Sequence, residues 1–193
     1  MRRFVWACLL LLAAAPAGAV ETDQARLDRG EVIVRMRAVE GSTLPMMVGR
    51  GVIDVPPARL WKVVEACGSY VGKLPRVIRS RELSRVGAVA VCETTSQLPF
   101  PIGELTSITR AVHETSPGRW VRRWTLVGGD YEDNSGAWIL QPFDAAGTRT
   151  LLTYEAHVEP KMSVPNAIIH AAQKRGMPTL FDHLRALMRS GGA

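Results

Sequence analysis

The sequence is poor in the residues that build metal and redox sites. Its 193 residues include three cysteines and four histidines, and no two cysteines have the CxxC spacing of a redox or zinc site. The histidines are also too far apart in sequence to form a metal-binding pair. The hydrolase signatures GxSxG and HExxH are absent. We therefore expect no metal and no cofactor, and we assign no catalytic residue.

Runs of like charge are absent as well, although the chain is basic. Its formal net charge is +6, and its 24 lysine and arginine residues are spread along the sequence. A basic balance often indicates nucleic-acid binding. Here no cluster of cations would form such a site, so we expect no nucleic-acid partner. We interpret the excess as a solvated surface, and the alternative is a weak attraction to anionic lipid headgroups.

Only one long hydrophobic run is present, near the start of the chain. Residues 4–15 are uncharged, follow two arginines and precede the small residues 17–19. This pattern is typical of a secretory signal peptide, which would comprise residues 1–19. The run is shorter than the ~20 apolar residues that a transmembrane helix needs. We expect export across the inner membrane and a periplasmic location, with an uncleaved membrane anchor as the alternative.

Cys67 and Cys92 are the two cysteines outside this leader. An oxidising compartment would permit them to pair. A disulfide would close the loop of chain between the two cysteines. In the chain-entropy model, closing a loop of that length stabilises a fold by about 3 kcal/mol. The alternative is two buried free thiols, because the sequence does not fix whether the two Cα atoms come within ~7 Å.

Hydrophobic periodicity predicts both strands and helices before Pro75. Residues 31–37 and 46–55 alternate as strands do. A helix is predicted after the proline pair that follows, ending at Gly68, and a short second helical turn over residues 69–74.

After Pro75 the pattern changes to strands joined by tight turns. Six strands are predicted, over residues 77–83, 86–98, 103–113, 119–127, 136–142 and 148–160. A long helix is predicted from Pro165, with an apolar stripe at helical spacing. Gly176 and Pro178 interrupt the stripe and predict a kink or a break.

These elements predict an α+β fold with an internal cavity. One face of an antiparallel sheet must be covered, and only the C-terminal helix is long enough to do so. We expect a curved antiparallel sheet of about six to seven strands wrapped around that helix. Residues 20–45 would form an N-terminal extension that could add an edge strand, and residues 46–190 the main domain.

Five segments resemble a known superfamily in their order along the chain. They are residues 51–61 (GVIDVPPARLW), 70–83 (YVGKLPRVIRSREL), 136–142 (GAWILQP) and 151–155 (LLTYE), followed by Pro165 at the start of the last helix. This set resembles the START-like, or SRPBCC, helix-grip superfamily. Within it, the set is most similar to the polyketide cyclase/dehydrase and coenzyme Q-binding START-like group.

The resemblance implies a lipid or other hydrophobic small molecule held between the sheet and the last helix. A binding or transport module is the first hypothesis. The alternative is a cyclase or dehydratase acting on a hydrophobic substrate in the same cavity. Such an enzyme would need an acid–base pair, for which the strands offer Glu93, Arg110, Glu155 and His157.

Aromatic residues on the predicted strands are the best candidates for the cavity wall. Trp120, Arg122 and Trp124 share one side of their strand, because side chains alternate. If that side points inward, Arg122 could hold an acidic ligand head; the alternative is that it extends to water at the sheet rim. Trp138 and Tyr154 suit a mainly apolar pocket, or plain core packing.

The candidate cavity residues are Trp120, Arg122, Trp124, Trp138, Tyr154, His157, Ile168, Ala172 and Leu180. The proline-stiffened loop over residues 98–103 is expected at the cavity mouth, where it would present Phe100 and Ile102. Exposed there, these side chains would allow transient contact with a membrane. The alternative is that Phe100 closes one end of the core.

Overall fold

The structure of the protein is a computed structural model that describes residues 22–100, 102–162 and 165–192. Within the last range, the side chains of residues 166–170 and 172–173 are not described. The signal peptide expected at residues 1–19 therefore lies outside the described residues.

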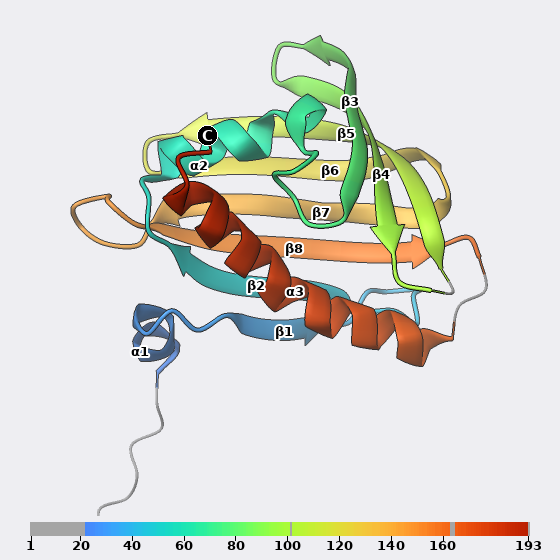
Figure 1. The fold of residues 1–193 in the computed structure, drawn as a ribbon, viewed down its shortest axis with the longest axis horizontal. Coiled ribbons are helices and arrows are strands. Elements are labelled where there is room, and N and C mark those ends of the chain that lie inside the picture. Colours follow the sequence, from blue (N-terminus) through green and yellow to red (C-terminus); the bar gives the residue numbers. More distant parts are fainter. Residues whose placement is uncertain (1–21, 101, 163–164, 193) are drawn as a thin grey trace, which may run out of the picture.

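One antiparallel sheet of eight strands forms the body of the protein (Figure 1). The strands are β1 (Ile33–Arg37), β2 (Met46–Ile53), β3 (Val77–Val86), β4 (Val89–Leu98), β5 (Gly103–Ser116), β6 (Arg119–Gly129), β7 (Tyr131–Pro142) and β8 (Thr150–Pro160). The α-helices are α1 (Asp23–Asp28), α2 (Pro57–Glu65) and α3 (Asn166–Arg189), and η1 (Cys67–Ser69) is a 3₁₀ turn.

The predicted α+β class, with an antiparallel sheet and a long C-terminal helix, is confirmed. The strand order is β1-β2-β8-β7-β6-β5-β4-β3, so β3 to β8 form a continuous meander. The sheet has eight strands rather than six or seven, because β1 and β2 pair with each other and β2 then pairs with β8. β1, from the N-terminal extension, lies at one edge.

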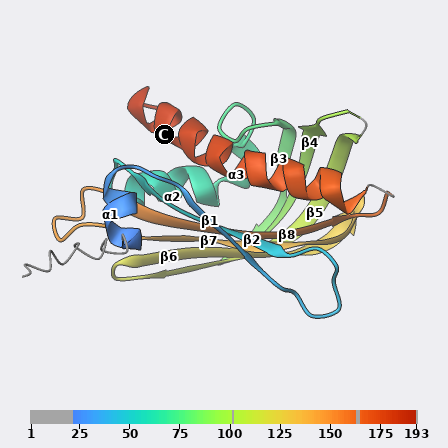
Figure 2. The same ribbon diagram turned by 90° about the horizontal axis from the view of Figure 1, so that it is seen from below.

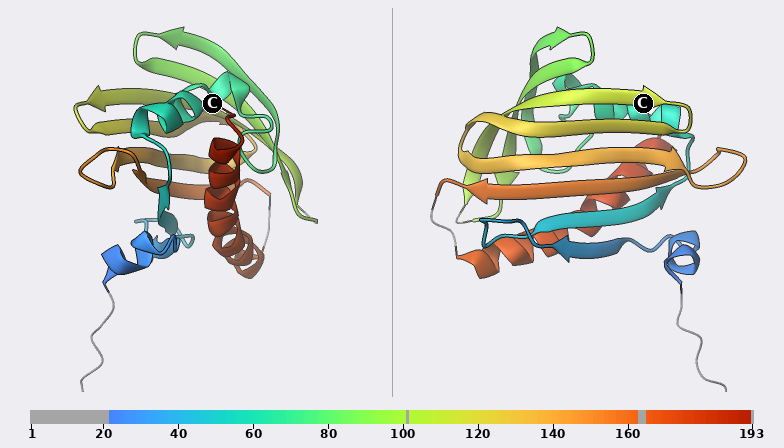
Figure 3. Two further views of the ribbon diagram at one scale, coloured as in Figure 1. Left: turned by 60° about the vertical axis from the view of Figure 1, so that its left-hand side comes forward. Right: turned by 180° about the vertical axis from the view of Figure 1, so that it is seen from behind.

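Both longer helices lie on one face of the curved sheet. Figure 2 shows α2 and α3 on the same side of β6, β7 and β8, and in the view from behind the strands lie in front of both helices (Figure 3). The main core cluster fills this interface with buried side chains from both helices and from the sheet, including Trp61, Leu140, Leu152, Phe181 and Leu184. The covered face is therefore the one on which a ligand site can form.

Two glycines on β2 allow α3 to pack closely against the sheet. A Cβ at Gly51 would lie 2.6 Å from Cδ1 of Phe181, and one at Gly49 would collide with the side chain of Met177. Real Cβ atoms do not make such contacts, so larger residues here would push the helix outward. The side chains of Met177 and Phe181 occupy the space that the two glycines leave free.

The helix α3 runs without a break through Gly176 and Pro178, so of the predicted kink or break, the break is wrong. Pro178 removes one backbone donor from the ladder. The hydroxyl of Thr179 donates to the carbonyl of Arg175 at 3.0 Å, and Phe181 is fully buried against the sheet. Tertiary packing on both sides of the proline therefore keeps the element continuous. Where a short helical turn is predicted over residues 69–74, the 3₁₀ turn η1 ends at Ser69, and a single turn follows in which the N–H groups of Lys73 and Leu74 both donate to the carbonyl of Tyr70.

Candidate functional site

A cavity of about 350 Å³ lies between the covered face of the sheet and α3. Its wall consists of side chains from seven strands, β2 to β8, from the β4–β5 loop, from α3 and from the segment that follows η1. Tyr154, Ala156, Val158 and Pro160 contribute from β8, at every second position, as expected for one face of a strand. The cavity therefore runs along the strands of the meander.

Three aromatic rings form one part of the wall. The rings of Trp138 and Tyr154 are 4.3 Å apart, and Tyr154 stacks on Trp124 at 5.8 Å. The indole N–H of Trp124 donates to Oδ1 of Asn134 at 3.0 Å. Burial raises the pKa of Tyr154 above its ordinary value, so its hydroxyl stays protonated. These rings offer a rigid apolar surface with few polar points.

Arg122 is a buried cation of this wall. It lies on β6 directly opposite Trp138, which in turn pairs with Tyr154. Its side chain is 4% exposed, so it does not extend to water at a sheet rim. The Nη2 atom lies 3.5 Å from Sγ of Cys92, and the guanidinium carbon is 5.8 Å from the ring centres of both Tyr70 and Trp124. The position of β6 in the middle of the sheet explains the burial.

Several predicted cavity residues line the cavity and others do not. Arg122, Trp124, Trp138, Tyr154 and Leu180 line it. Trp120 shares their face of β6 but packs against the main core cluster, beyond the end of the cavity. Ile168 and Ala172 belong to the residues whose side chains the structure does not describe.

The placement of His157 in the cavity is wrong. Its neighbours Ala156 and Val158 line the cavity, so the alternation of β8 points His157 to the opposite face of the sheet. There it is 2% exposed, with Nε2 3.4 Å from Oε1 of Glu159. It therefore cannot meet a ligand between the sheet and α3.

The two residues predicted for the cavity mouth, both on the loop between β4 and β5, differ in their exposure to solvent. Ile102 is buried and lines the cavity, whereas Phe100 is 96% exposed. The exposure of Phe100 overturns the alternative that it closes one end of the core. Pro101, between them, lies outside the described residues.

The groups considered for acid–base chemistry point away from the cavity. Glu155 and His157 flank Ala156 on β8, and Glu93 precedes Thr94, which lines the cavity on β4. On β5, Arg110 follows Thr109, another lining residue. None of the lining residues in the described part of the chain is an aspartate, glutamate, histidine or lysine. The wall supplies hydroxyls, an amide and two arginines instead.

Cys67 and Cys92 form a disulfide, with Cα atoms 6.2 Å apart. It joins η1 to β4 and lies in a small core cluster with Tyr70 and Ala90. The hydroxyl of Tyr70 donates to the carbonyl of Val64 at 2.5 Å. The disulfide thus fixes the segment that forms the cavity wall next to Arg122.

Tyr70, Tyr131 and Arg76 also line the cavity, although no pattern in the sequence had indicated them. Burial raises the pKa of Tyr131 to about 12. Arg76 has φ of 66°, and it is the one non-glycine residue with positive φ in the described ranges. Only its position directly after Pro75, at a strand start, could have suggested an irregular backbone there.

A second cluster of ionisable groups lies behind the disulfide. Nη1 of Arg85 donates to Nδ1 of His113 at 3.1 Å, and Arg85 also pairs with Glu82 at 2.6 Å. Burial, reinforced by the positive charges of Arg122 and Arg85, lowers the pKa of His113 to about 4. His113 is therefore neutral near pH 7 and adds no charge beside Arg122.

Across the described ranges, no group of three or more potential metal ligands is found.

Residues 53–185 match the family model described as polyketide cyclase/dehydrase and lipid transport. The match covers more than half of the sequence and includes α2, the meander and most of α3. The chain belongs to this family. The resemblance noted from the sequence is thereby confirmed. No curated protein matches the sequence.

Several solved structures share the fold of this chain at low sequence identity. A STAR-related lipid transfer protein from Xanthomonas axonopodis is 20% identical, with a TM-score of 0.67 over 86% of this chain and 97% of that one. Human StAR-related lipid transfer protein 5 is 16% identical, with a TM-score of 0.75 over 85% and 84%. The ZhuI aromatase/cyclase from Streptomyces sp. R1128 is 15% identical, with a TM-score of 0.61 over 82% and 99%.

Proposed function

We propose that this family member is an exported, periplasmic binding or transport module for a lipid or other hydrophobic small molecule. The observation that carries the proposal is the cavity, whose described lining residues include three contacting aromatic rings and no carboxylate, histidine or lysine. An apolar wall with a few polar points suits ligand binding. The Cys67–Cys92 disulfide supports an oxidising compartment.

A cyclase or dehydratase activity has weaker support. The family includes cyclases, and one of the similar structures is named an aromatase/cyclase. Proton transfer needs an acid or base within reach of the substrate. The four groups that the strands offered for this role, Glu93, Arg110, Glu155 and His157, are not among the lining residues. Ligand binding without catalysis is therefore the better explanation for the residues that line the cavity.

Native mass spectrometry tests the binding function. The protein is purified from the periplasm of its own host, and any bound molecule is extracted into organic solvent. We expect a mass above that of the chain, from a bound hydrophobic molecule. The variant Ala156→Phe places a ring in the cavity and should therefore reduce uptake of the ligand relative to the native protein. A ligand-free mass, with no uptake from a total lipid extract, would contradict the proposal.

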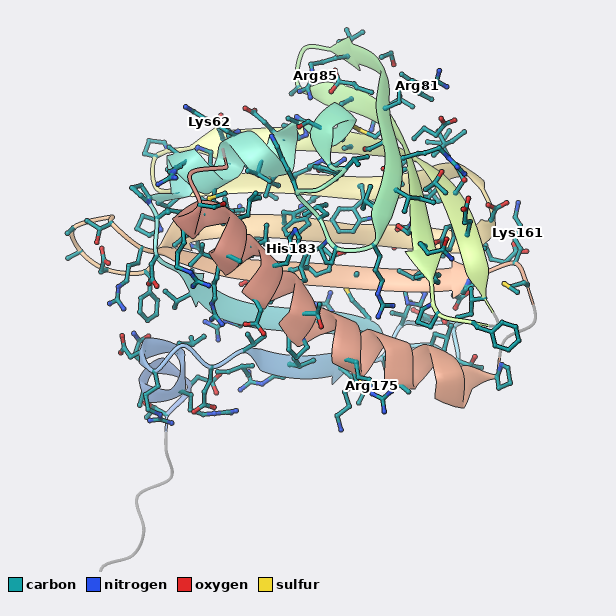
Figure 4. The ribbon with its side chains drawn as sticks, in the orientation of Figure 1. Lys62, Arg81, Arg85, Lys161, Arg175 and His183 are labelled. Carbon is teal, nitrogen blue, oxygen red and sulfur yellow. A yellow bond between two sulfur atoms is a disulfide. The ribbon has the colours of Figure 1, made fainter. Side chains whose placement is uncertain are left out.

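We also propose that the loop between β4 and β5 contacts a membrane transiently. Phe100 is 96% exposed there, and Met162, after β8, is 38% exposed. The meander brings both loops to the same end of the sheet, where Figure 4 shows Lys161 beside the end of β8. An exposed aromatic side chain with a lysine at the same end of the sheet favours contact with anionic lipid headgroups. No helix in the described part of the chain is long and apolar enough to cross a bilayer.

Vesicle co-sedimentation tests this contact. Phe100→Ser should reduce binding to vesicles of phosphatidylglycerol and phosphatidylethanolamine about tenfold or more, because full burial of a phenylalanine side chain contributes about 1.5–3 kcal/mol. Val86→Ser is the matched control, since Val86 is 79% exposed at the β3–β4 turn, at the other end of the sheet. Equal binding by both variants would rule out a specific role for Phe100.

A further inference from the structure

Arg122 is a buried positive charge with no carboxylate in direct contact among the described residues. It is 4% exposed, and the nearest acidic influence on it is a longer-range attraction to Glu82, whose carboxylate pairs directly with Arg85 instead. A guanidinium offers five N–H donors and no acceptor, so its burial calls for acceptors around it. An unpaired buried ion is strongly unfavourable. The cavity wall therefore holds a charge for which the described part of the chain supplies no direct ion-pair partner.

The neighbours of Arg122 compensate for this charge only in part. The rings of Tyr70 and Trp124 are each 5.8 Å from the guanidinium carbon, which provides weak cation–π attraction. The sulfur of Cys92 is a weak acceptor. The Nε atom is buried and has no hydrogen-bond partner among the described residues. At least one donor of the guanidinium is thus available to an acceptor that is not part of the chain.

The rest of the described cavity lining is mainly apolar and lacks negative charge, and its polar groups other than Arg76 are neutral hydroxyls and one amide. Arg76, at the exposed rim, is the other charged residue of the described lining. On β8 the lining runs from Tyr154, in the same cross-strand row as Arg122, to Pro160 at the loop end. These two residues are six apart, which corresponds to about 20 Å of strand. Arg122 therefore places a buried cation at one end of the cavity, and a mainly apolar wall continues from it toward the loop end, where Arg76 lies at the exposed rim.

We propose that the ligand is a single-chain amphiphile with a carboxylate head, such as a fatty acid, and that Arg122 binds the head. This inference rests on the proposed binding function and specifies its ligand. A planar carboxylate accepts paired hydrogen bonds from a guanidinium. The hydrocarbon chain lies along Trp124 and Tyr154 toward Ile102. A cavity of about 350 Å³ is at the small end of ligand sites, which favours one hydrocarbon chain over two.

Calorimetric titration of the delipidated protein tests the proposal with hexadecanoic acid, hexadecanol and methyl hexadecanoate. We expect the acid to bind at least about tenfold more tightly than the alcohol or the ester. The reason is that hydrogen bonds between charged groups are stronger than those made by a neutral head. Arg122→Gln should remove this preference while leaving the affinity for hexadecanol within about twofold. Arg122→Lys, which keeps the positive charge, should retain part of the preference for the acid. Arg76→Gln, the matched control at the rim, should keep the full preference.

The outcomes separate this inference from the proposed function. Equal binding of acid, alcohol and ester by the unaltered protein would overturn the carboxylate head and leave hydrophobic ligand binding intact. Binding of none of the three, nor of any molecule from a lipid extract, would overturn both. The comparison of acid with alcohol on the unaltered protein decides the question even where Arg122→Gln fails to fold. Retention of the full preference by a folded Arg122→Gln variant would show that another group holds the head.

Discussion

The double variant Cys67→Ala/Cys92→Ala should unfold with a free energy about 3 kcal/mol lower than that of the native protein. The disulfide closes a loop with a sequence separation of 25 that contains η1 and the edge strand β3. Without it, the unfolded chain gains the conformations that the cross-link forbids. Alanine is preferred to serine, because both cysteines are almost fully buried and a hydroxyl there would need a partner. Urea unfolding followed by tryptophan fluorescence measures the difference.

Reduction of the native protein with a dithiol is the companion measurement. It breaks the same cross-link without changing the sequence, so it should lower the free energy of unfolding by a similar amount. The loss should appear mainly in residues 67–92, which amide hydrogen exchange can resolve. A change below about 1 kcal/mol in both experiments would show that the rest of the fold already holds β3 and η1 in place.

The elements that depend on neighbours in sequence could be predicted. The six strands of the meander alternate in hydrophobicity, and turn-forming residues separate them, as Gly118 does between β5 and β6. The start of α2 follows from Pro56 and Pro57, since proline is tolerated in the first turn. The apolar stripe after Pro165 likewise predicts α3. Each of these patterns is contained within a few residues.

Features that depend on long-range packing could not be predicted. The pairing of β2 with β8 joins segments about 100 residues apart, and no local pattern specifies it. The same holds for the burial of Arg122, which follows from the central place of β6 in the sheet. The burial of Phe181 against Gly49 and Gly51, which holds α3 together across Pro178, also appears only in three dimensions.

One error about the site could have been avoided from the sequence itself. Tyr154 and His157 are three positions apart on one strand, so they must point to opposite faces. Both could not line the same cavity. The register with β7 decides whether Tyr154 or His157 points toward the helix. In that register Tyr154 pairs with Trp138, and His157 pairs with Ser135. Strand alternation thus limits the candidates, and only the register selects among them.

Phe181→Ala should lower the free energy of unfolding by about 3–5 kcal/mol. Phe181 is fully buried on α3, and its ring fills the space above Gly49 and Gly51. Alanine would leave a cavity that those glycines cannot fill, because they have no side chains. Neighbouring side chains can relax only in part, so the cavity adds to the lost hydrophobic transfer energy. Urea unfolding of the purified variant gives the value.

Phe100→Ala is the matched control, since it removes the same atoms from a ring that is 96% exposed. Its effect on the free energy of unfolding should stay within about 0.5 kcal/mol. Phe181→Leu should fall between the two, because it keeps most of the apolar contact with the sheet. If Phe181→Ala and Phe100→Ala lost equal stability, the packing of α3 on β2 would not hold the helix on the sheet. The ligand cavity beneath α3 would then have to be kept closed by contacts elsewhere along the helix.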